Sequence, residues 1–279
     1  MRFQHGDLGG DHFANQRPHH RREIGTPSPR CHAGSVDVDQ RYAYAYDMRM
    51  HTISDVGPAH RAAVLASVDV VGVVTRDDLR RPTPCAGWNL LDLLAHMTVQ
   101  HHGFAAAARG GGDSPTVWES ARVADAVAAD PGGTYAAAAA DVLDAFAAQG
   151  VLDAAFALPE LGPGASFPGA LAIGFHFVDF VVHGWDVAQS IGAHLALPET
   201  VVAAVLPLVF AVPDGEYRTM DGAPFGPAAA APDDATDLDR IVSHLGRSPD
   251  WKPVGRAGSN PRPTDYESLF GAWATRQNG

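Results

Sequence analysis

The sequence predicts an all-α protein: a bundle of four or five helices with additional C-terminal helices and disordered tails. Apolar residues recur at helical spacing in several segments between residues 54 and 246. Capping residues, prolines and glycines mark the ends of most of these segments, and no convincing run of alternating strand residues interrupts them. Because each such helix must bury its apolar face against another element, a helical bundle is the expected architecture.

The two ends of the chain differ in composition from its middle. Residues 1–53 are rich in histidine, arginine, proline and glycine, and they follow neither a period of 2 nor one of 3.6. Such a segment buries too little apolar surface to offset the entropy of ordering, so we expect a disordered extension, with Met48 or Met50 as alternative starts to Met1. Residues 254–279 are expected to form a loose tail, which leaves one helical domain at 54–253.

Composition restricts the classes of partner. Hydrophobic residues make up 46% of the 279 residues, which is enough for a sizeable core. The net charge of -12 argues against nucleic acid and anionic membranes as partners. The chain begins without the apolar run of a signal peptide, and its two cysteines, Cys31 and Cys85, make no disulfide framework. We therefore expect a soluble, cytoplasmic protein with neither a nucleic-acid nor a membrane partner.

The first half of the domain is expected to form helices. Pro58 suits the first turn of the first helix, and Asn89 suits the N-cap of the second. The fourth is rich in alanine and bounded by glycines, which gives it a high helix propensity. The expected ranges are 54–79, 89–110, about 116–129 and 132–150.

The second half is expected to begin with an irregular or extended segment at 151–168, because its three prolines exclude a helix. A long helix follows at 168–191, and Gly192 is its expected C-cap. Two shorter helices are expected at 197–212 and 234–246, with a loop between them.

The helix expected at 168–191 carries a polar stripe in otherwise apolar sequence, "HFVDFVVHGWDVA". Its members His176, Asp179, His183 and Asp186 lie within a sector of about 80° on a helical wheel. The rest of the wheel is apolar, so this stripe is expected to face the bundle interior. A buried carboxylate without a partner is costly, so the stripe must meet another polar side chain, water in a cleft, or a metal ion.

A divalent cation is one of these possible partners. The i, i+4 pair of Asp179 and His183 converges well on such an ion, and zinc accepts both ligand types, often with three protein ligands and one open position. His96, in the middle of the apolar helical stretch "LLDLLAHM", is the best candidate for a third ligand. The alternative is a hydrogen-bonded pair without metal, in which Asp179 keeps His183 charged.

Other chemically distinctive side chains receive structural interpretations. We expect Trp88 and Trp185 to be packing residues and Cys85 to be a buried thiol. His101 and His102 are expected to be solvated. An isolated arginine is as a rule a solvated surface charge, which is the expectation for Arg218 and Arg240, although an arginine could also clamp an anionic substrate.

The segments "TPCAGWNLLDLLAHM" and "DFVVHGWDVAQSIG" together resemble the actinobacterial branch of the DinB-like superfamily. That branch includes the metal-binding domain of mycothiol-dependent maleylpyruvate isomerase, and "LGRSPDWKP" is similar to the end of that domain. The resemblance covers about residues 54–253 and implies a four-helix DinB-like bundle.

The resemblance also implies a ligand set, which falls on His96, Asp179 and His183. The isomerase resembles a pattern in which the acidic ligand is glutamate. This chain has Asp179 at that position, and the side chain of aspartate is one methylene shorter. The ion would therefore sit closer to the helix or be bound less tightly. His176 and Asp186 are expected around the ligands, where a carboxylate can orient a ligand imidazole.

The function implied by the resemblance is that of an enzyme in which a divalent metal, zinc, activates mycothiol for attack on an electrophilic substrate. An isomerase and a thiol transferase both fit. No catalytic side chain is assigned, because the nucleophile belongs to the cosubstrate. Two alternatives stay open, a metal-dependent hydrolase and a non-catalytic metal-binding protein, because one fold hosts many functions.

Overall fold

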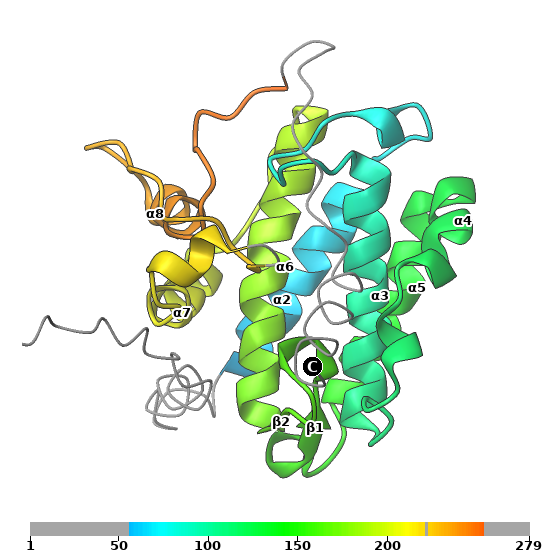
Figure 1. Ribbon diagram of the computed structural model, residues 1–279. Helices are drawn as coiled ribbons and strands as arrows, with labels where there is room; N and C mark the ends of the chain where they lie inside the picture. The colour runs from blue at the N-terminus through cyan, green and yellow to red at the C-terminus, as the bar shows by residue number, and fades with distance from the viewer. Residues whose placement is uncertain (1–55, 221–222, 254–279) are drawn as a thin grey trace, which may run out of the picture.

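A computed structural model describes residues 56–220 and 223–253, and it shows a predominantly helical protein (Figure 1). Four helices form the bundle: α2 (Val56–Val71), α3 (Leu90–Ala108), α5 (Pro131–Phe146) and α6 (Gly169–Ile191). α2 packs against α5 and α6, and α3 packs against the same two helices, so the four form a closed ring. The predicted all-α fold class is confirmed.

Shorter elements connect and flank the bundle. α4 (Ala121–Ala129) packs against α3 and α5. The C-terminal helices α7 (Glu199–Phe210) and α8 (Asp237–His244) pack against each other, and α7 also packs against α2 and α6 (Figure 1). Short 3-10 helices occupy Asp78–Arg80, Pro115–Trp118, Val151–Asp153, Pro159–Leu161 and Glu216–Thr219.

Local sequence signals determine where the long helices begin and end. Asn89 caps α3 with a reciprocal capping box: its side chain accepts a hydrogen bond from the Asp92 backbone N–H, and the Asp92 carboxylate accepts one from the Asn89 N–H. α6 ends at Gly192, whose φ of 69° is in the left-handed region, as predicted for its C-cap. These two ends fix where the polar side chains of α3 and α6 point.

The segment predicted to be irregular or extended forms a short antiparallel hairpin, β1 (Ala155–Ala157) with β2 (Ser166–Pro168). Phe156 and Phe167 are opposite each other in it, and both are buried. The hairpin packs against α3 and α6 at one end of the bundle (Figure 1). It therefore bridges the two helices that carry the predicted ligands.

One predicted helix starts later than expected. The region at about 116–129 begins as a 3-10 turn, Pro115–Trp118, and becomes α-helical only at Ala121. Trp118 explains the break, because its buried indole N–H donates to the Gly112 carbonyl at 2.9 Å and anchors the turn against the core.

α6 is the central helix, and most of its residues are buried. Among the described residues it alone has the length and mean hydropathy that a membrane span requires, but 83% of its apolar window is buried inside the protein. That burial is typical of a core helix.

A buried arginine holds the C-terminal segment, contrary to the expectation from the sequence. Arg218, expected to be a solvated surface charge, is buried, and its guanidinium donates to the carbonyls of Val212 and Pro213 at 3.0 and 2.8 Å. An isolated arginine becomes buried when backbone carbonyls saturate its donors, as they do here. Arg240 is exposed and pairs with Asp237 at 3.4 Å. The predicted tails, 1–53 and 254–279, lie outside the described residues.

Candidate metal centre

The three predicted ligands lie together in the interior of the bundle. One ligand atom from each of His96, Asp179 and His183 lies within 4.8 Å of the other two. His183 Nε2 is 3.3 Å from Asp179 Oδ1, and the rings of His96 and His183 are 5.2 Å apart and nearly perpendicular. Donors on a tetrahedral zinc ion, at bonds of about 2.1 Å, are about 3.4 Å apart, so this set fits such an ion without large movements.

Helix geometry explains why these side chains converge. The capping box sets the phase of α3, so that His96, one turn after Asp92, faces α6. On α6, Asp179 and His183 are one turn apart and share a face. Trp88 covers the pair of imidazoles, with ring centroids 4.9 Å from His96 and 6.5 Å from His183. Trp88 therefore packs, as predicted, and it packs against the candidate ligands. Trp185 is buried in the core.

A second carboxylate fixes the orientation of His183. Asp186 is fully buried, and its Oδ2 accepts a hydrogen bond from His183 Nδ1 at 2.9 Å. This bond leaves Nε2 of His183 for Asp179 or for a cation. Asp186 therefore lies beside a ligand imidazole, as expected from the sequence. Carboxylates commonly orient metal-binding histidines in this way.

Arg247, which the sequence analysis did not single out, balances the charge of Asp186. It follows α8, is buried, and places Nη2 3.1 Å from Asp186 Oδ2 and 3.3 Å from the sulfur of Cys85. The only signal for it was its place in "LGRSPDWKP". Cys85, predicted to be a buried thiol, is partly buried and lies 3.1 Å from the same carboxylate oxygen.

A second set of donors overlaps with the first. Cys85, His183 and Asp186 also offer atoms within 4.8 Å of one another. However, Arg247 contacts both the thiol and the carboxylate, and its fixed positive charge repels a cation placed there. The set of His96, Asp179 and His183 is therefore the better cation site.

The electrostatics of the site suit a cation on Nε2 of His183. Burial lowers the pKa of His96 to about 4, against the opposing effect of Asp179, so this imidazole is neutral and can act as a ligand near pH 7. Burial also opposes protonation of His183, but its interactions with Asp179, Cys85 and Asp186 outweigh it and raise its pKa well above the ordinary value. A positive charge is favoured at this position, and either a proton or a metal ion can supply it.

The deep burial of Asp186 does not neutralise it. Burial alone would raise the pKa of this carboxyl, but the Arg247 guanidinium and His183 hold it at about 2. Asp186 is therefore ionised at every physiological pH and can accept the hydrogen bond from His183 throughout this range.

Two histidine predictions were wrong. His176 does not lie around the ligands: its ring nitrogens are hydrogen-bonded to His60 at 2.9 Å and to His101 at 3.1 Å. His101, expected to be solvated, is completely buried and stacks on Phe180 with ring centroids 4.0 Å apart. The reason is that α3 packs against both α5 and α6, so more than its His96 face is covered. His102 is exposed, as predicted.

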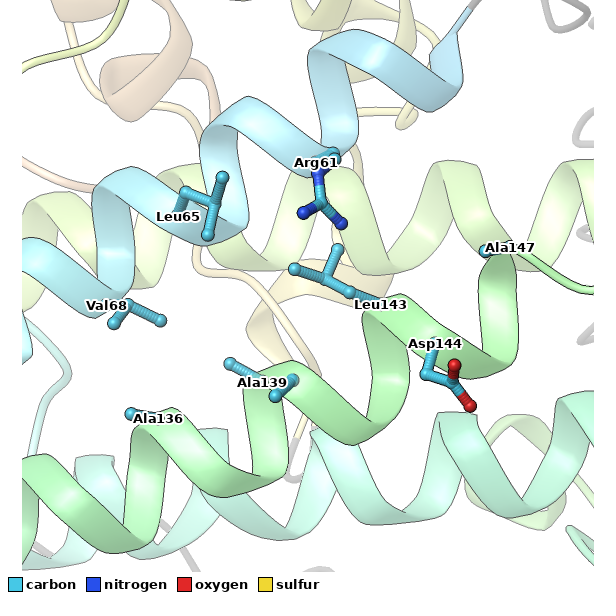
Figure 2. A pocket seen from close by; sticks show the side chains of 9 residues that line it. Arg61, Leu65, Val68, Ala136, Ala139, Leu143, Asp144 and Ala147 are labelled. Atoms are coloured by element: carbon cyan, nitrogen blue, oxygen red, sulfur yellow. The ribbon is translucent and has the colours of Figure 1, made fainter.

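A surface groove lies elsewhere on the bundle. It measures about 360 Å³ and runs between α2 and α5, and its lining includes Arg61 and Leu65 of α2 and Leu143 and Asp144 of α5 (Figure 2). None of the residues of the metal group lines it. The candidate ligands therefore lie apart from this groove, inside the bundle.

A four-helix bundle with one histidine on the second of its helices and an Asp-x-x-x-His pair on the last has the DinB-like fold. Comparison with known proteins identifies the family within that class. The sequence model of the mycothiol maleylpyruvate isomerase N-terminal domain matches residues 60–188. Two uncharacterized proteins of Mycobacterium tuberculosis, from two strains, are each 30% identical over 193 residues, which cover 68% of this chain and 96% of the relative. The chain therefore belongs to the family of the mycothiol maleylpyruvate isomerase N-terminal domain.

A solved structure agrees at the level of the fold. The crystal structure of the mycothiol-dependent maleylpyruvate isomerase superposes with a TM-score of 0.51 over 78% of this chain and 98% of that chain. The two sequences are only 14% identical, so this likeness concerns the fold and not the reaction.

Proposed function

We propose that the protein binds one divalent metal ion, zinc, through His96, Asp179 and His183, and that it acts on the thiol mycothiol. The observation that carries the proposal is the convergence of these three side chains with Asp186 behind His183. Imidazole and carboxylate are ligands that zinc accepts, and three protein ligands leave one position open. When bound, the ion would lower the pKa of a thiol at that open position and so favour the thiolate nucleophile.

The side chains around the ligands have separate tasks. Asp186 holds His183 with Nε2 directed at Asp179, and Arg247 keeps Asp186 ionised. The indole of Trp88 shields the two imidazoles from solvent on one side. Together these contacts preorganise the site, so that little rearrangement is needed when an ion binds.

The choice of cosubstrate rests on the relatives. The family is named for mycothiol maleylpyruvate isomerase, and the solved structure of similar fold is described as mycothiol-dependent. The reaction of this chain would then be isomerisation of an activated cis double bond or transfer of the thiol to an electrophilic carbon. This proposal places the protein in the cytoplasm, where low-molecular-weight thiols stay reduced.

A metal-free ion pair is the alternative that an experiment has to exclude. The 3.3 Å between His183 Nε2 and Asp179 Oδ1 is longer than the 2.7–2.9 Å or so of a charge-assisted hydrogen bond. It is close to the spacing of two donors on one ion, which supports the metal-bound form. A non-catalytic metal protein and a metal-dependent hydrolase share this geometry.

The test uses the purified full-length chain with cobalt in place of zinc. Titration with mycothiol should produce a thiolate-to-cobalt absorption band in the near ultraviolet. A band that saturates with mycothiol supports thiol chemistry. Bound cobalt without any spectral response to mycothiol would contradict it and would favour hydrolysis or a non-catalytic role.

A further inference from the structure

A carboxyl group from the hairpin contacts α3 one helical turn away from the candidate ligand His96. Glu160 is in the 3-10 helix Pro159–Leu161, between β1 and β2, and its side chain is partly buried. Gln100 Nε2 on α3 donates a hydrogen bond to Glu160 Oε2 at 2.8 Å. Because Gln100 is itself buried, this bond draws the Glu160 carboxyl toward the interior.

The position of Gln100 relates Glu160 to the ligands. Gln100 follows His96 by four residues, so the two side chains lie on one face of α3, one turn apart. The hairpin itself packs against α3 and α6, the two helices that supply the ligands. The negative charge of Asp179 on α6 contributes to raising the pKa of the Glu160 carboxyl.

The environment of Glu160 suits a group that exchanges protons. Burial raises its pKa to about 7, against the opposing hydrogen bond from Gln100, and the charge of Asp179 adds to the increase. No arginine, lysine or histidine of the described residues forms an ion pair with it. The carboxyl is therefore divided between its acid and base forms near neutral pH, which is where general acid–base catalysis is most effective.

The other acids and bases near the centre already have partners. His96, Asp179 and His183 form the ligand set, and Asp186 is tied to His183 and Arg247. Within the described part of the chain, Glu160 has a single hydrogen bond, from a neutral amide, so no charged partner there holds it in one protonation state.

We propose that Glu160 is the catalytic proton carrier of this site: it takes the proton of the incoming thiol and later returns it to the substrate. The inference rests on the proposed function and adds a residue to it. In the first step the S–H bond breaks, its electron pair stays on sulfur, and an O–H bond forms on Glu160. In transfer to an activated alkene, sulfur then bonds to one carbon, the π pair moves to the next carbon or its conjugated oxygen, and Glu160 returns the proton there. No further reactant is consumed.

The experiment compares Glu160→Gln with the wild-type full-length protein, both loaded with cobalt. Glutamine keeps the size and the contact with Gln100 but cannot carry a proton. Stopped-flow mixing with mycothiol measures how fast the thiolate band forms between pH 5 and pH 9. The wild-type rate should rise with pH as the Glu160 carboxyl, whose pKa is raised by burial, loses its proton. In Glu160→Gln this inflection should disappear and the rate should fall by roughly 100-fold or more.

Two further variants exclude a merely structural effect. Glu199→Gln makes the same chemical change at an exposed residue in the first turn of α7 and should leave the rate unchanged. Glu160→Ala should recover part of the lost rate when formate is added, because a small carboxylate can replace the missing group. Cobalt content and circular dichroism of each variant establish that the fold and the ligand set are intact.

The outcomes separate this inference from the proposed function. A wild-type band together with a wild-type rate and pH profile in Glu160→Gln would overturn the role of Glu160 and leave thiol binding standing. Absence of the band from the wild-type protein would overturn both.

Discussion

At the scale of single residues, the candidate centre depends most on His183, because its two ring nitrogens face two different carboxylates. Nδ1 is held by Asp186 at 2.9 Å, and Nε2 faces Asp179 at 3.3 Å. Asp186 in turn is paired with the buried Arg247. This chain of contacts makes the side chain at 186 as important for a bound ion as the ligands themselves.

Replacing Asp186 by asparagine should weaken metal binding and the fold together. The variant keeps the shape of the side chain but removes its charge, so His183 becomes a poorer ligand and Arg247 is left without its counter-ion. We expect a loss of roughly 10- to 100-fold in metal affinity and a decrease of about 3–5 kcal/mol in the free energy of unfolding. Chelator competition and urea denaturation measure the two effects. Asp141→Asn, at an exposed ion pair, is the control, and equal behaviour of the two variants would contradict the assignment.

The sequence predicted the residues of this site unevenly, for a physical reason. Asp179, His183 and Asp186 follow one helical period, so their common face is visible in the sequence, and His96 is conspicuous in an apolar helix. Arg247 and Glu160 come from short irregular segments, where no period shows which way a side chain points. Their roles depend on tertiary contacts that only the structure reveals.

At the scale of elements, the close contact at the start of α6 decides how the long helix meets the hairpin. A Cβ added to Gly169 would lie 1.9 Å from the carbonyl oxygen of Val151. Gly174, farther along α6, has more room, since its nearest neighbour would be Leu208 Cδ1 at 3.9 Å. The lack of a side chain at Gly169 therefore permits the close approach of the Val151 backbone, whereas no such close contact exists at Gly174.

The two glycines should respond to alanine with opposite signs. Gly169→Ala forces the helix and the Val151 carbonyl apart, and we expect a loss of roughly 1–3 kcal/mol in the free energy of unfolding. Gly174→Ala should be neutral or should stabilise the protein by up to about 1 kcal/mol, because alanine favours a helix interior. Thermal or urea unfolding of both variants tests this, and equal stability of the two would show that the contact is not restrictive.

The elements themselves differed in how well the sequence predicted them. Long helices with caps, such as α3 after Asn89 and α6 before Gly192, were located correctly because caps and period agree. The β1–β2 hairpin was predicted only as extended or irregular, since strands of three residues are too short to show alternation. The delayed start of α4 depends on the buried Trp118, a tertiary contact.

At the scale of the whole molecule, a chain of three buried histidines joins three helices of the bundle. His60 on α2, His176 on α6 and His101 on α3 are hydrogen-bonded in that order and are surrounded by aromatic rings. Burial lowers the pKa of His60 to about 3 and those of His101 and His176 well below their ordinary values. The folded protein therefore keeps these three imidazoles neutral.

This chain should make the fold sensitive to acid. Because the unfolded chain binds a proton at each of these histidines below about pH 6.5, stability should fall as pH decreases from 6.5 toward the folded pKa of about 3 at His60. Each histidine contributes a slope of about 1.4 kcal/mol per pH unit within its window. His183, whose pKa is raised, acts in the opposite direction, with stability lost as pH rises above its ordinary value.

The measurement is the difference between the wild-type protein and His60→Gln, both free of metal. The free energy of unfolding of the variant should fall less steeply with decreasing pH between 6.5 and 4, by about one proton's slope. Above pH 4 the ionised Asp186 contributes little to the slope, because its pKa is about 2. Equal slopes in the two proteins would show that His60 is not kept neutral by burial.

The most direct test of the central claim is the metal content of the purified protein and its histidine variants. The wild-type chain should contain one divalent ion per molecule, and so should His102→Ala, whose side chain is exposed on the same helix as His96. His96→Ala and His183→Ala should each lose the stoichiometric ion while keeping the helical circular dichroism spectrum. Retention of one ion per chain by both ligand variants, or its absence from the wild-type protein, would contradict the metal centre.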